Sequence, residues 1–117
     1  MCQLLTSFYK MFSLFMFQLV EGGGLPDNVY DIWELTGKRR EAEYTWDTQR
    51  NDNLEMPGRF KPRLRFDRLY IRHSLPKKVQ PEYFELCGLE RLKPSRRFCS
   101  DHWALLTHLN ILSKVPK

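Results

Sequence analysis

The stretch Phe98-Cys99-Ser100-Asp101-His102-Trp103, followed by the apolar run Ala104-Leu105-Leu106, is the most informative part of this chain. The upstream segment Leu64-Arg65-Phe66-Asp67-Arg68 belongs with it. In the first segment a carboxylate and an imidazole come directly before an apolar strand. A charge at such a position is costly unless it is paired or takes part in binding or catalysis. Phosphate chemistry is the use that this pattern favours.

Length and composition limit the alternatives. The chain has 117 residues, of which 42% are hydrophobic and 14% aromatic, enough for one modest domain, or part of a larger one, with a core. Its net charge of +5 and pI of about 9.3 favour polyanionic partners, although many proteins that bind none share such values. Cys2, Cys87 and Cys99 form no even set and no C-x-x-C pair, so we expect neither a disulfide scaffold nor a zinc site, and a reducing compartment.

Residues 1–21 differ from the rest of the chain. Met11 to Val20 is almost wholly apolar, but Lys10 interrupts the run, which is shorter than the roughly 20 residues needed to cross a bilayer. The basic start and the small-residue cleavage site of a signal peptide are also missing. We therefore expect no membrane span, and treat 1–21 as a divergent apolar segment from an alternative start, with a buried strand or helix as the alternative. A domain should follow from 22 to 117.

After this segment the pattern predicts one helix followed by strands. Pro26-Asp27-Asn28 supplies capping residues, apolar residues share a face, and Gly37 stands where a helix would stop, which together predict a short helix near 28–36. Strands are expected at 44–48, 63–72, 79–89 and 102–112. The segment 49–62, rich in Asn, Asp, Pro and Gly, reads as a long loop of the kind that contacts ligands.

Basic residues alternate with apolar ones in the predicted strand and the loop before it. The basic members are Arg59, Lys61, Arg63 and Arg65, and the apolar members are Phe60, Pro62, Leu64 and Phe66. An extended chain would present one basic edge and an apolar reverse. This edge suits phosphates, with Trp46 and Phe66 near enough to stack on bases, but a solvated face that aids solubility is the competing interpretation.

Asp67 shares strand parity with Leu69 and Ile71 and should therefore point inward, where it needs a partner. His102 is the candidate, since a carboxylate that accepts from one ring nitrogen leaves the other free to donate to a phosphate oxygen. The alternative is a structural Asp67 paired with Arg65 or Arg68, and a His102 that only caps a strand.

Other polar residues suggest less. Ser100 is not expected to form a serine triad, because neighbours on one strand point apart. His73 and His108 show no partner pattern and should be structural or exposed. Without a second carboxylate cluster, the sequence completes no metal site.

Several motifs resemble one family in both order and spacing. They are Asp31-Ile32-Trp33-Glu34, Tyr44-Thr45-Trp46-Asp47-Thr48-Gln49, Asn51 with Asn53 and Leu54, Leu64-Arg65-Phe66-Asp67-Arg68, Leu86-Cys87-Gly88-Leu89-Glu90 and Ser100-Asp101-His102-Trp103. Ser-Asp-His is typical of the endonuclease/exonuclease/phosphatase superfamily. The Thr-Trp-Asp-Thr-Gln run narrows the resemblance to the tyrosyl-DNA phosphodiesterase 2 family, over about Gly22 to Ile111.

The resemblance implies a fold and an activity. The fold is α/β, the C-terminal part of a four-layered α/β sandwich (DNase I-like) with mostly antiparallel strands. The activity is that of a DNA-repair hydrolase dependent on Mg²⁺ (or Mn²⁺), which removes topoisomerase II tyrosine adducts from DNA 5′ ends. The implied partner is DNA with 5′-phosphotyrosyl ends, and the implied compartment is the nucleus, with the cytoplasm also possible.

The resemblance also assigns roles. It implies that His102 contacts the scissile phosphate and that Asp67 orients His102. It implies that Asp101 supports the metal through water. The expected DNA-contacting residues, besides His102, are Trp46, Phe66, Leu54 and Met56.

The departures are equally informative. The metal-binding Asn and Glu of the family and its Gly-Asp-x-Asn motif do not occur in this sequence. We therefore expect a truncated fragment that, made alone, folds poorly and is inactive. The alternatives are a noncatalytic DNA-binding module, or another nuclease or phosphatase of the superfamily, which Trp46-Asp47-Thr48-Gln49 disfavours.

Overall fold

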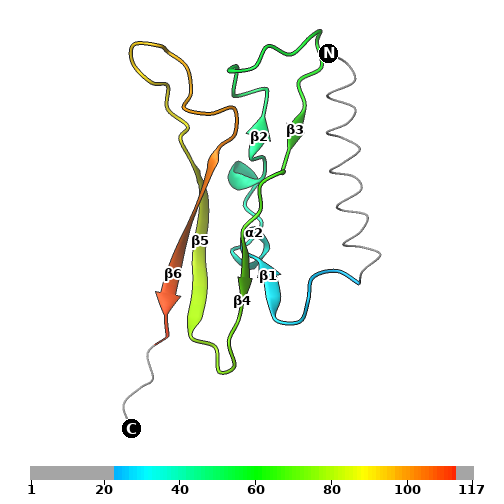
Figure 1. Ribbon diagram of the computed structural model, residues 1–117, viewed down its shortest axis with the longest axis vertical. Helices are drawn as coiled ribbons and strands as arrows, with labels where there is room; N and C mark the ends of the chain where they lie inside the picture. The colour runs from blue at the N-terminus through cyan, green and yellow to red at the C-terminus, as the bar shows by residue number, and fades with distance from the viewer. Residues whose placement is uncertain (1–22, 113–117) are drawn as a thin grey trace.

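The computed structural model describes residues 23–112, so the predictions for 1–21, Cys2 included, lie outside the described residues. Six strands, one short α-helix and one 3₁₀ turn make up this part (Figure 1). In chain order they are β1 (Val29–Asp31), α2 (Ile32–Leu35), η1 (Arg40–Ala42), β2 (Trp46–Asp47), β3 (Arg63–Leu64), β4 (Tyr70–Arg72), β5 (Val79–Cys87) and β6 (Ala104–Ile111).

The strands form three antiparallel pairs, β1 with β4, β2 with β3, and β5 with β6. The first two pairs lie end to end in one column, and the long β5–β6 pair runs beside them (Figure 1). A register shift between Pro81 and Tyr83 interrupts the β5–β6 ladder. A single bridge from Trp46 to His102 connects the β2–β3 pair to the segment that leads into β6.

The predicted helix at 28–36 is wrong in its first half. Residues 29–31 pair with β4 instead, with Tyr30 opposite Ile71. The cap is Asp31, whose carboxylate accepts the Trp33 N–H at 3.0 Å. Helical spacing of the apolar residues did not decide the structure here, because strand pairing with a distant segment overrode it.

The other element predictions are confirmed only in part. The long loop after β2 and the strand β5 are close to expectation, but 63–72 is two short strands separated by an irregular segment at 65–69. The expected strand at 44–48 is reduced to Trp46–Asp47 because the chain turns after Asp47, whose carbonyl accepts the Asn51 N–H at 2.8 Å. His102 forms only a bridge, so β6 begins at Ala104.

The apolar core is small. Its buried members are Ile32, Ala42, Phe84, Leu86 and Trp103, with Trp33, Leu69, Ile71, Phe98 and Leu105 packed around them. Phe84 and Leu86 share one face of β5, as the strand period of two requires. Among the described residues, no helix is long and apolar enough to span a membrane.

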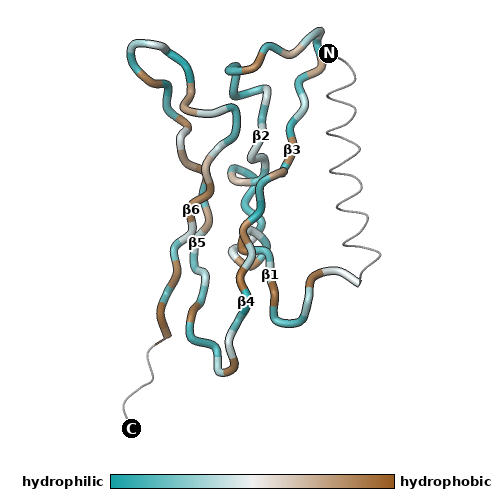
Figure 2. The backbone as a smooth tube through the Cα atoms, in the orientation of Figure 1, coloured by the Kyte–Doolittle hydropathy of each residue, from teal (hydrophilic) through white to brown (hydrophobic). Residues whose placement is uncertain are grey.

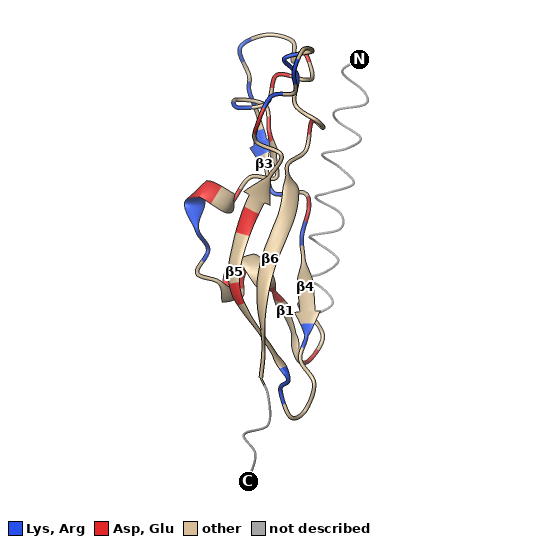
Figure 3. Ribbon diagram, turned by 90° about the vertical axis from the view of Figure 1, so that its left-hand side faces the viewer, with Lys and Arg blue, Asp and Glu red and all other residues tan. Residues whose placement is uncertain are grey.

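The far half of β6 lies outside this core. Leu109 is 49% exposed and Ile111 is 77% exposed, and both are apolar (Figure 2). The strand carries no Lys, Arg, Asp or Glu along its length (Figure 3). An uncharged, apolar edge strand is the feature that soluble domains normally cover or protect with charges. This half of the hairpin is therefore the part of the described structure least protected against association.

Candidate phosphate-facing site

His102 lies where β2 meets the segment leading into β6. Trp46 forms the antiparallel bridge with it, and the Trp103 N–H donates to the Thr45 carbonyl at 2.8 Å. Ser100 Oγ accepts the His102 N–H at 3.1 Å, so the serine hydroxyl stabilises the turn before the histidine. The backbone on both sides of His102 is therefore fixed by hydrogen bonds.

The side chains of His102 and Asp67 meet. His102 Nδ1 lies 2.6 Å from a carboxylate oxygen of Asp67, although the two residues are 35 positions apart. A carboxylate opposite Nδ1 favours the tautomer or protonation state in which Nδ1 carries a proton. Nε2, the other ring nitrogen, is then the one available to a ligand.

The pair is more accessible than the sequence indicated. The Asp67 side chain is 40% exposed and that of His102 is 35% exposed, so neither is buried. The parity argument for Asp67 is wrong in this respect, because the chain at 65–69 is not a regular strand. The alternative pairing of Asp67 with Arg65 or Arg68 is also wrong, since both guanidiniums contact Asp31. The exposure leaves room for a ligand to reach the imidazole.

Aromatic rings continue from this pair. The Phe66 ring centroid lies 6.2 Å from that of His102, and the Trp46 centroid lies 5.4 Å from that of Phe66. Trp46 is only 7% exposed, whereas Phe66 is half-buried. Phe66 is therefore the ring of this set that offers more surface to a ligand, while Trp46 mainly supports it.

The turn at 51–53 fixes the backbone segment that leads to His102, a role that was not predicted from the residue pattern. The amide of buried Asn51 donates to the Ser100 carbonyl at 2.8 Å. Asn53 donates to the Phe98 carbonyl at 2.8 Å and accepts the Phe98 N–H at 3.0 Å, as a neighbouring strand would. These hydrogen bonds join residues 45 to 49 positions apart, so they become apparent only in the three-dimensional structure.

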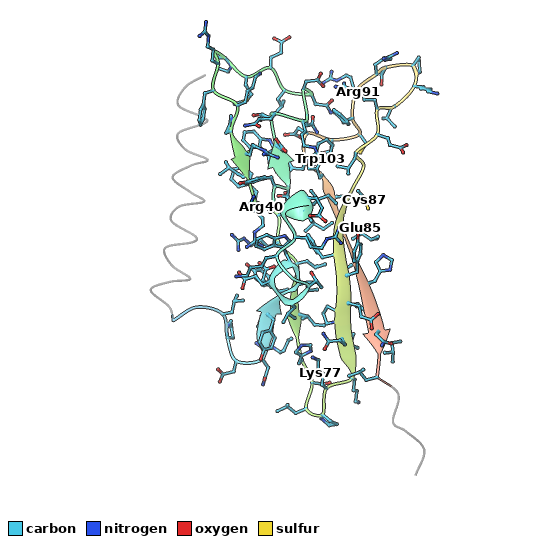
Figure 4. All side chains as sticks on the ribbon, turned by 180° about the vertical axis from the view of Figure 1, so that it is seen from behind. Arg40, Lys77, Glu85, Cys87, Arg91 and Trp103 are labelled. Atoms are coloured by element: carbon cyan, nitrogen blue, oxygen red, sulfur yellow. The ribbon has the colours of Figure 1, made fainter. Side chains whose placement is uncertain are left out.

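Asp52, between the two asparagines, binds the connector from β5 to β6. Its carboxylate accepts two hydrogen bonds from Arg91, each 3.0 Å long. Arg91 also stacks over the Phe98 ring at 4.4 Å, and Figure 4 shows it at the connector, farther along the long axis than Trp103. The Arg91 guanidinium holds the pKa of the Asp52 carboxyl below its usual range by hydrogen bonding. The connector and the 51–53 turn are therefore joined outside the core.

The predicted basic stripe is not a continuous exposed edge. Arg63 pairs with buried Asp47 at 2.9 Å, and this hydrogen bond raises the pKa of Arg63. Arg65 and Arg68 lie 2.6 and 3.4 Å from the Asp31 carboxylate, and their side chains are only 13% and 17% exposed. The stripe prediction is wrong for Arg63 and Arg65 because buried carboxylates bind their guanidiniums. Arg59 and Lys61, in the loop, remain exposed.

Leu54 and Met56 lie in the long loop between β2 and β3. Leu54 is 46% exposed and Met56 is half-buried. The same loop carries Phe60, which is 69% exposed between exposed Arg59 and Lys61. The loop thus exposes apolar and basic side chains, and among the described residues no hydrogen bond, ion pair or ring contact joins Leu54 or Met56 to the His102–Asp67 pair.

Asp101 is the residue on which the metal prediction depends. Its carboxylate lies 4.0 Å from His102 Nε2 and its side chain is 39% exposed. Within residues 23–112, no three His, Cys, Asp or Glu side chains are grouped so that they could hold a metal ion. The described residues do not fit a complete Mg²⁺ or Mn²⁺ site, since such ions take several oxygen ligands.

The two remaining histidines lie away from this site. His73 packs its ring against Tyr30, with centroids 5.3 Å apart. His108 lies on β6, 60% exposed, with Nε2 3.6 Å from a Glu85 carboxylate oxygen. Cys87 and Cys99 are free thiols.

Comparison with known proteins finds relatives of this chain. Tyrosyl-DNA phosphodiesterase 2 of Rattus norvegicus is 47% identical over 95 residues, which are 81% of this chain and 25% of the relative. The Homo sapiens protein of that name is 46% identical over 91 residues, 77% of this chain and 24% of the relative. Over this span the chain resembles the C-terminal portion of tyrosyl-DNA phosphodiesterase 2.

Solved structures agree with the sequence match. The crystal structure of D. rerio TDP2 complexed with single-strand DNA product superposes with a TM-score of 0.72 at 38% identity, covering 80% of this chain and 36% of that one. The C. elegans TDP2 structure gives a TM-score of 0.61, also at 38% identity, covering 76% of this chain and 25% of that one. The described residues thus form an α/β fragment of a DNase I-like fold.

The extent of these matches is limited. The chain spans about a quarter of the length of the curated tyrosyl-DNA phosphodiesterase 2 relatives that it matches. No family model matches the sequence.

Proposed function

We propose that this chain supplies the phosphate-contacting histidine and part of the DNA-contacting surface of a 5′-tyrosyl-DNA phosphodiesterase, a DNA-repair hydrolase. The observation that carries the proposal is the 2.6 Å contact between His102 Nδ1 and Asp67 in a half-exposed position. Relatives at 38–47% identity that carry this name support it.

The chemistry follows from the pair. A 5′-phosphotyrosyl bond gains negative charge on its phosphoryl oxygens as water attacks and the phenolate leaves. A donor held at the correct position before the reaction lowers the barrier, because it need not reorganise as the charge develops. Asp67 accepts from Nδ1 and fixes the orientation of the ring, so Nε2 is the nitrogen that faces a phosphoryl oxygen, and it donates to that oxygen when both ring nitrogens carry a proton. The role of this chain in hydrolysis is therefore electrostatic and positional.

DNA is the proposed partner, specifically a 5′ end that bears a topoisomerase II tyrosine. The D. rerio relative was crystallised with single-strand DNA product, which supports DNA as the class of ligand. Phe66, supported by Trp46, would offer a face to the terminal base, and base–aromatic stacking is insensitive to sequence. Leu54 and Met56 would extend the apolar wall, and Asp101 would contact water in a metal shell whose ligands lie outside residues 23–112. A nuclear location is proposed from this substrate.

A noncatalytic DNA-binding module is the second candidate. The exposed sequence Arg59-Phe60-Lys61 favours it, since a basic, aromatic loop can hold a single strand without any hydrolytic group.

Two measurements separate these candidates. The full 117-residue chain is assayed on a 5′-phosphotyrosyl oligonucleotide, with release of tyrosine as the readout. A chimera is assayed in parallel, in which residues 23–112 replace the matching segment of D. rerio TDP2. We expect turnover by the chimera and none by the full chain alone. A folded but inactive chimera that still binds the oligonucleotide would overturn the enzymatic proposal and favour the binding module.

A further inference from the structure

Thr45, which directly precedes β2, is fully buried, with 0% of its surface exposed. It lies between the two segments that carry the reactive pair. Its carbonyl oxygen accepts the Trp103 N–H at 2.8 Å, next to His102 in the chain. Its hydroxyl oxygen accepts the Asp67 N–H at 2.9 Å. One residue therefore bonds to the backbone beside His102 and to that of Asp67.

The hydroxyl bond matters because the backbone of Asp67 is not part of a strand. Asp67 falls between β3, which ends at Leu64, and β4, which begins at Tyr70. Its side chain is 40% exposed, so packing alone does not fix it either. The hydrogen bond to Thr45 is thus a specific restraint on where the Asp67 carboxylate stands relative to the imidazole.

We propose that the Thr45 hydroxyl is a positioning group for the Asp67–His102 pair. Threonine is stiff at χ1, so its hydroxyl oxygen is held at one place once the residue is buried. Without that oxygen, the Asp67 N–H loses its acceptor and the segment at 65–69 can shift. The Asp67–His102 bond then lengthens, and the imidazole is no longer fixed toward the phosphate. The catalytic part of this inference rests on the proposed function, whereas the structural part does not.

The chain offers a matched control in Thr48. Thr48 is also buried, at 7% exposure, and its hydroxyl donates to the Pro62 carbonyl at 2.8 Å. It lies just after β2 and bonds to neither member of the pair among the described interactions. If loss of any buried hydroxyl near β2 disturbed the site, Thr45→Val and Thr48→Val would behave alike.

The first test observes the pair directly. The ring proton between His102 Nδ1 and Asp67 should give a far-downfield ¹H NMR resonance, assigned by its loss in His102→Asn. It is recorded in the full chain and in the chimera, for the wild type and for Thr45→Val, Thr45→Ser and Thr48→Val. We expect Thr45→Val to move or abolish the resonance and Thr45→Ser, which keeps the oxygen, to restore it. An unchanged resonance in folded Thr45→Val would overturn the proposal.

The second test uses kinetics of the chimera. Small misplacements of a catalytic group cost up to about a hundredfold in rate, so we expect kcat to fall about tenfold to a hundredfold in Thr45→Val, with KM within about twofold. Thr45→Ser and Thr48→Val should stay within about threefold of wild type. Equal losses in both valine variants, or no rescue by serine, would refute a specific role for the hydroxyl. If Asp67→Asn and His102→Asn leave hydrolysis unchanged, the proposed function fails, and the NMR result alone decides the role of Thr45.

Discussion

The two ends of the described structure are stabilised in different ways. At the site end, Thr45, Asn51 and Asn53 hold the segments around His102 through hydrogen bonds between residues distant in sequence. At the opposite end of the β5–β6 pair, Leu109 and Ile111 of β6 are largely exposed. The first region is held together by hydrogen bonds among its own residues, whereas the second leaves apolar side chains exposed.

This difference shows which properties a segment of a fold can retain. Buried polar groups need hydrogen-bond partners, and those of Thr45, Asn51 and Asn53 lie within the described residues. Apolar burial instead depends on layers that pack against each other. The matching segment is only 36% of the D. rerio TDP2 chain, so most of that structure lies outside the comparison. Site geometry and stability can therefore be tested separately.

The largest expected effect is on hydrolysis at the site end. Removal of one preorganised hydrogen-bond donor costs about 10²- to 10³-fold in kcat, so we expect a loss of that size for His102→Asn in the chimera. His108→Asn is the control, because His108 lies on β6, is 60% exposed and contacts Glu85. Steady-state assays on a 5′-phosphotyrosyl oligonucleotide measure both. Similar rates for the two variants would remove the functional distinction between the two ends.

The next effect is on stability. Asn51→Ala removes a buried side chain that donates to the Ser100 carbonyl and accepts the Asn53 N–H, and the loss of each such hydrogen bond costs about 0.5–1.5 kcal/mol. Asn110→Ala removes an exposed hydrogen bond to Glu82 and should change the free energy of unfolding by less than about 0.5 kcal/mol. Urea unfolding of the chimera gives both values. If Asn110→Ala lowers the free energy of unfolding as much as Asn51→Ala does, the proposed difference between the two ends is contradicted.

Substitutions at the apolar end of the β5–β6 pair should change self-association more than they change the free energy of unfolding. Charges on an exposed edge strand oppose pairing with another chain. We therefore expect Ile111→Lys in the full chain to raise the monomeric fraction in size-exclusion chromatography with light scattering. Lys78→Ile, an exposed change beside Val79 at the start of β5, should lower it. No difference between these variants and wild type would show that the exposed face of β6 does not drive self-association.

The smallest effect concerns the exposed pair of Asp52 and Arg91. The pKa of Asp52 is lowered by Arg91, so the pair stabilises the fold above the unfolded-state pKa of about 3.9 and loses this contribution as pH falls through the folded-state pKa. Arg91→Gln should therefore lower the melting temperature of the chimera slightly at neutral pH and not at about pH 2. A larger loss at acid pH would contradict this assignment.

Part of this structure was predictable from residue types. The Asp67–His102 pairing was predicted, although the inward position assumed for Asp67 was wrong, and β5 was predicted at 79–89 against the observed Val79–Cys87. The contacts of Thr45 and Asn51 did not follow, because each depends on the fold bringing together segments far apart in sequence. The prediction of a helix at 28–36 was wrong for the same reason, because Val29–Asp31 pairs with β4 as a strand.

The double pairing of Asp31 changes how the net charge of the chain should be understood. Its carboxylate begins α2 and also engages Arg65 and Arg68. Arg63 pairs with the Asp47 carboxylate. These three guanidiniums share two carboxylates, so together they contribute a net charge of +1 rather than +3 and displace fewer counterions from a nucleic acid. The salt dependence of DNA affinity should therefore follow the loop cations, such as Arg59 and Lys61, rather than the total number of basic residues.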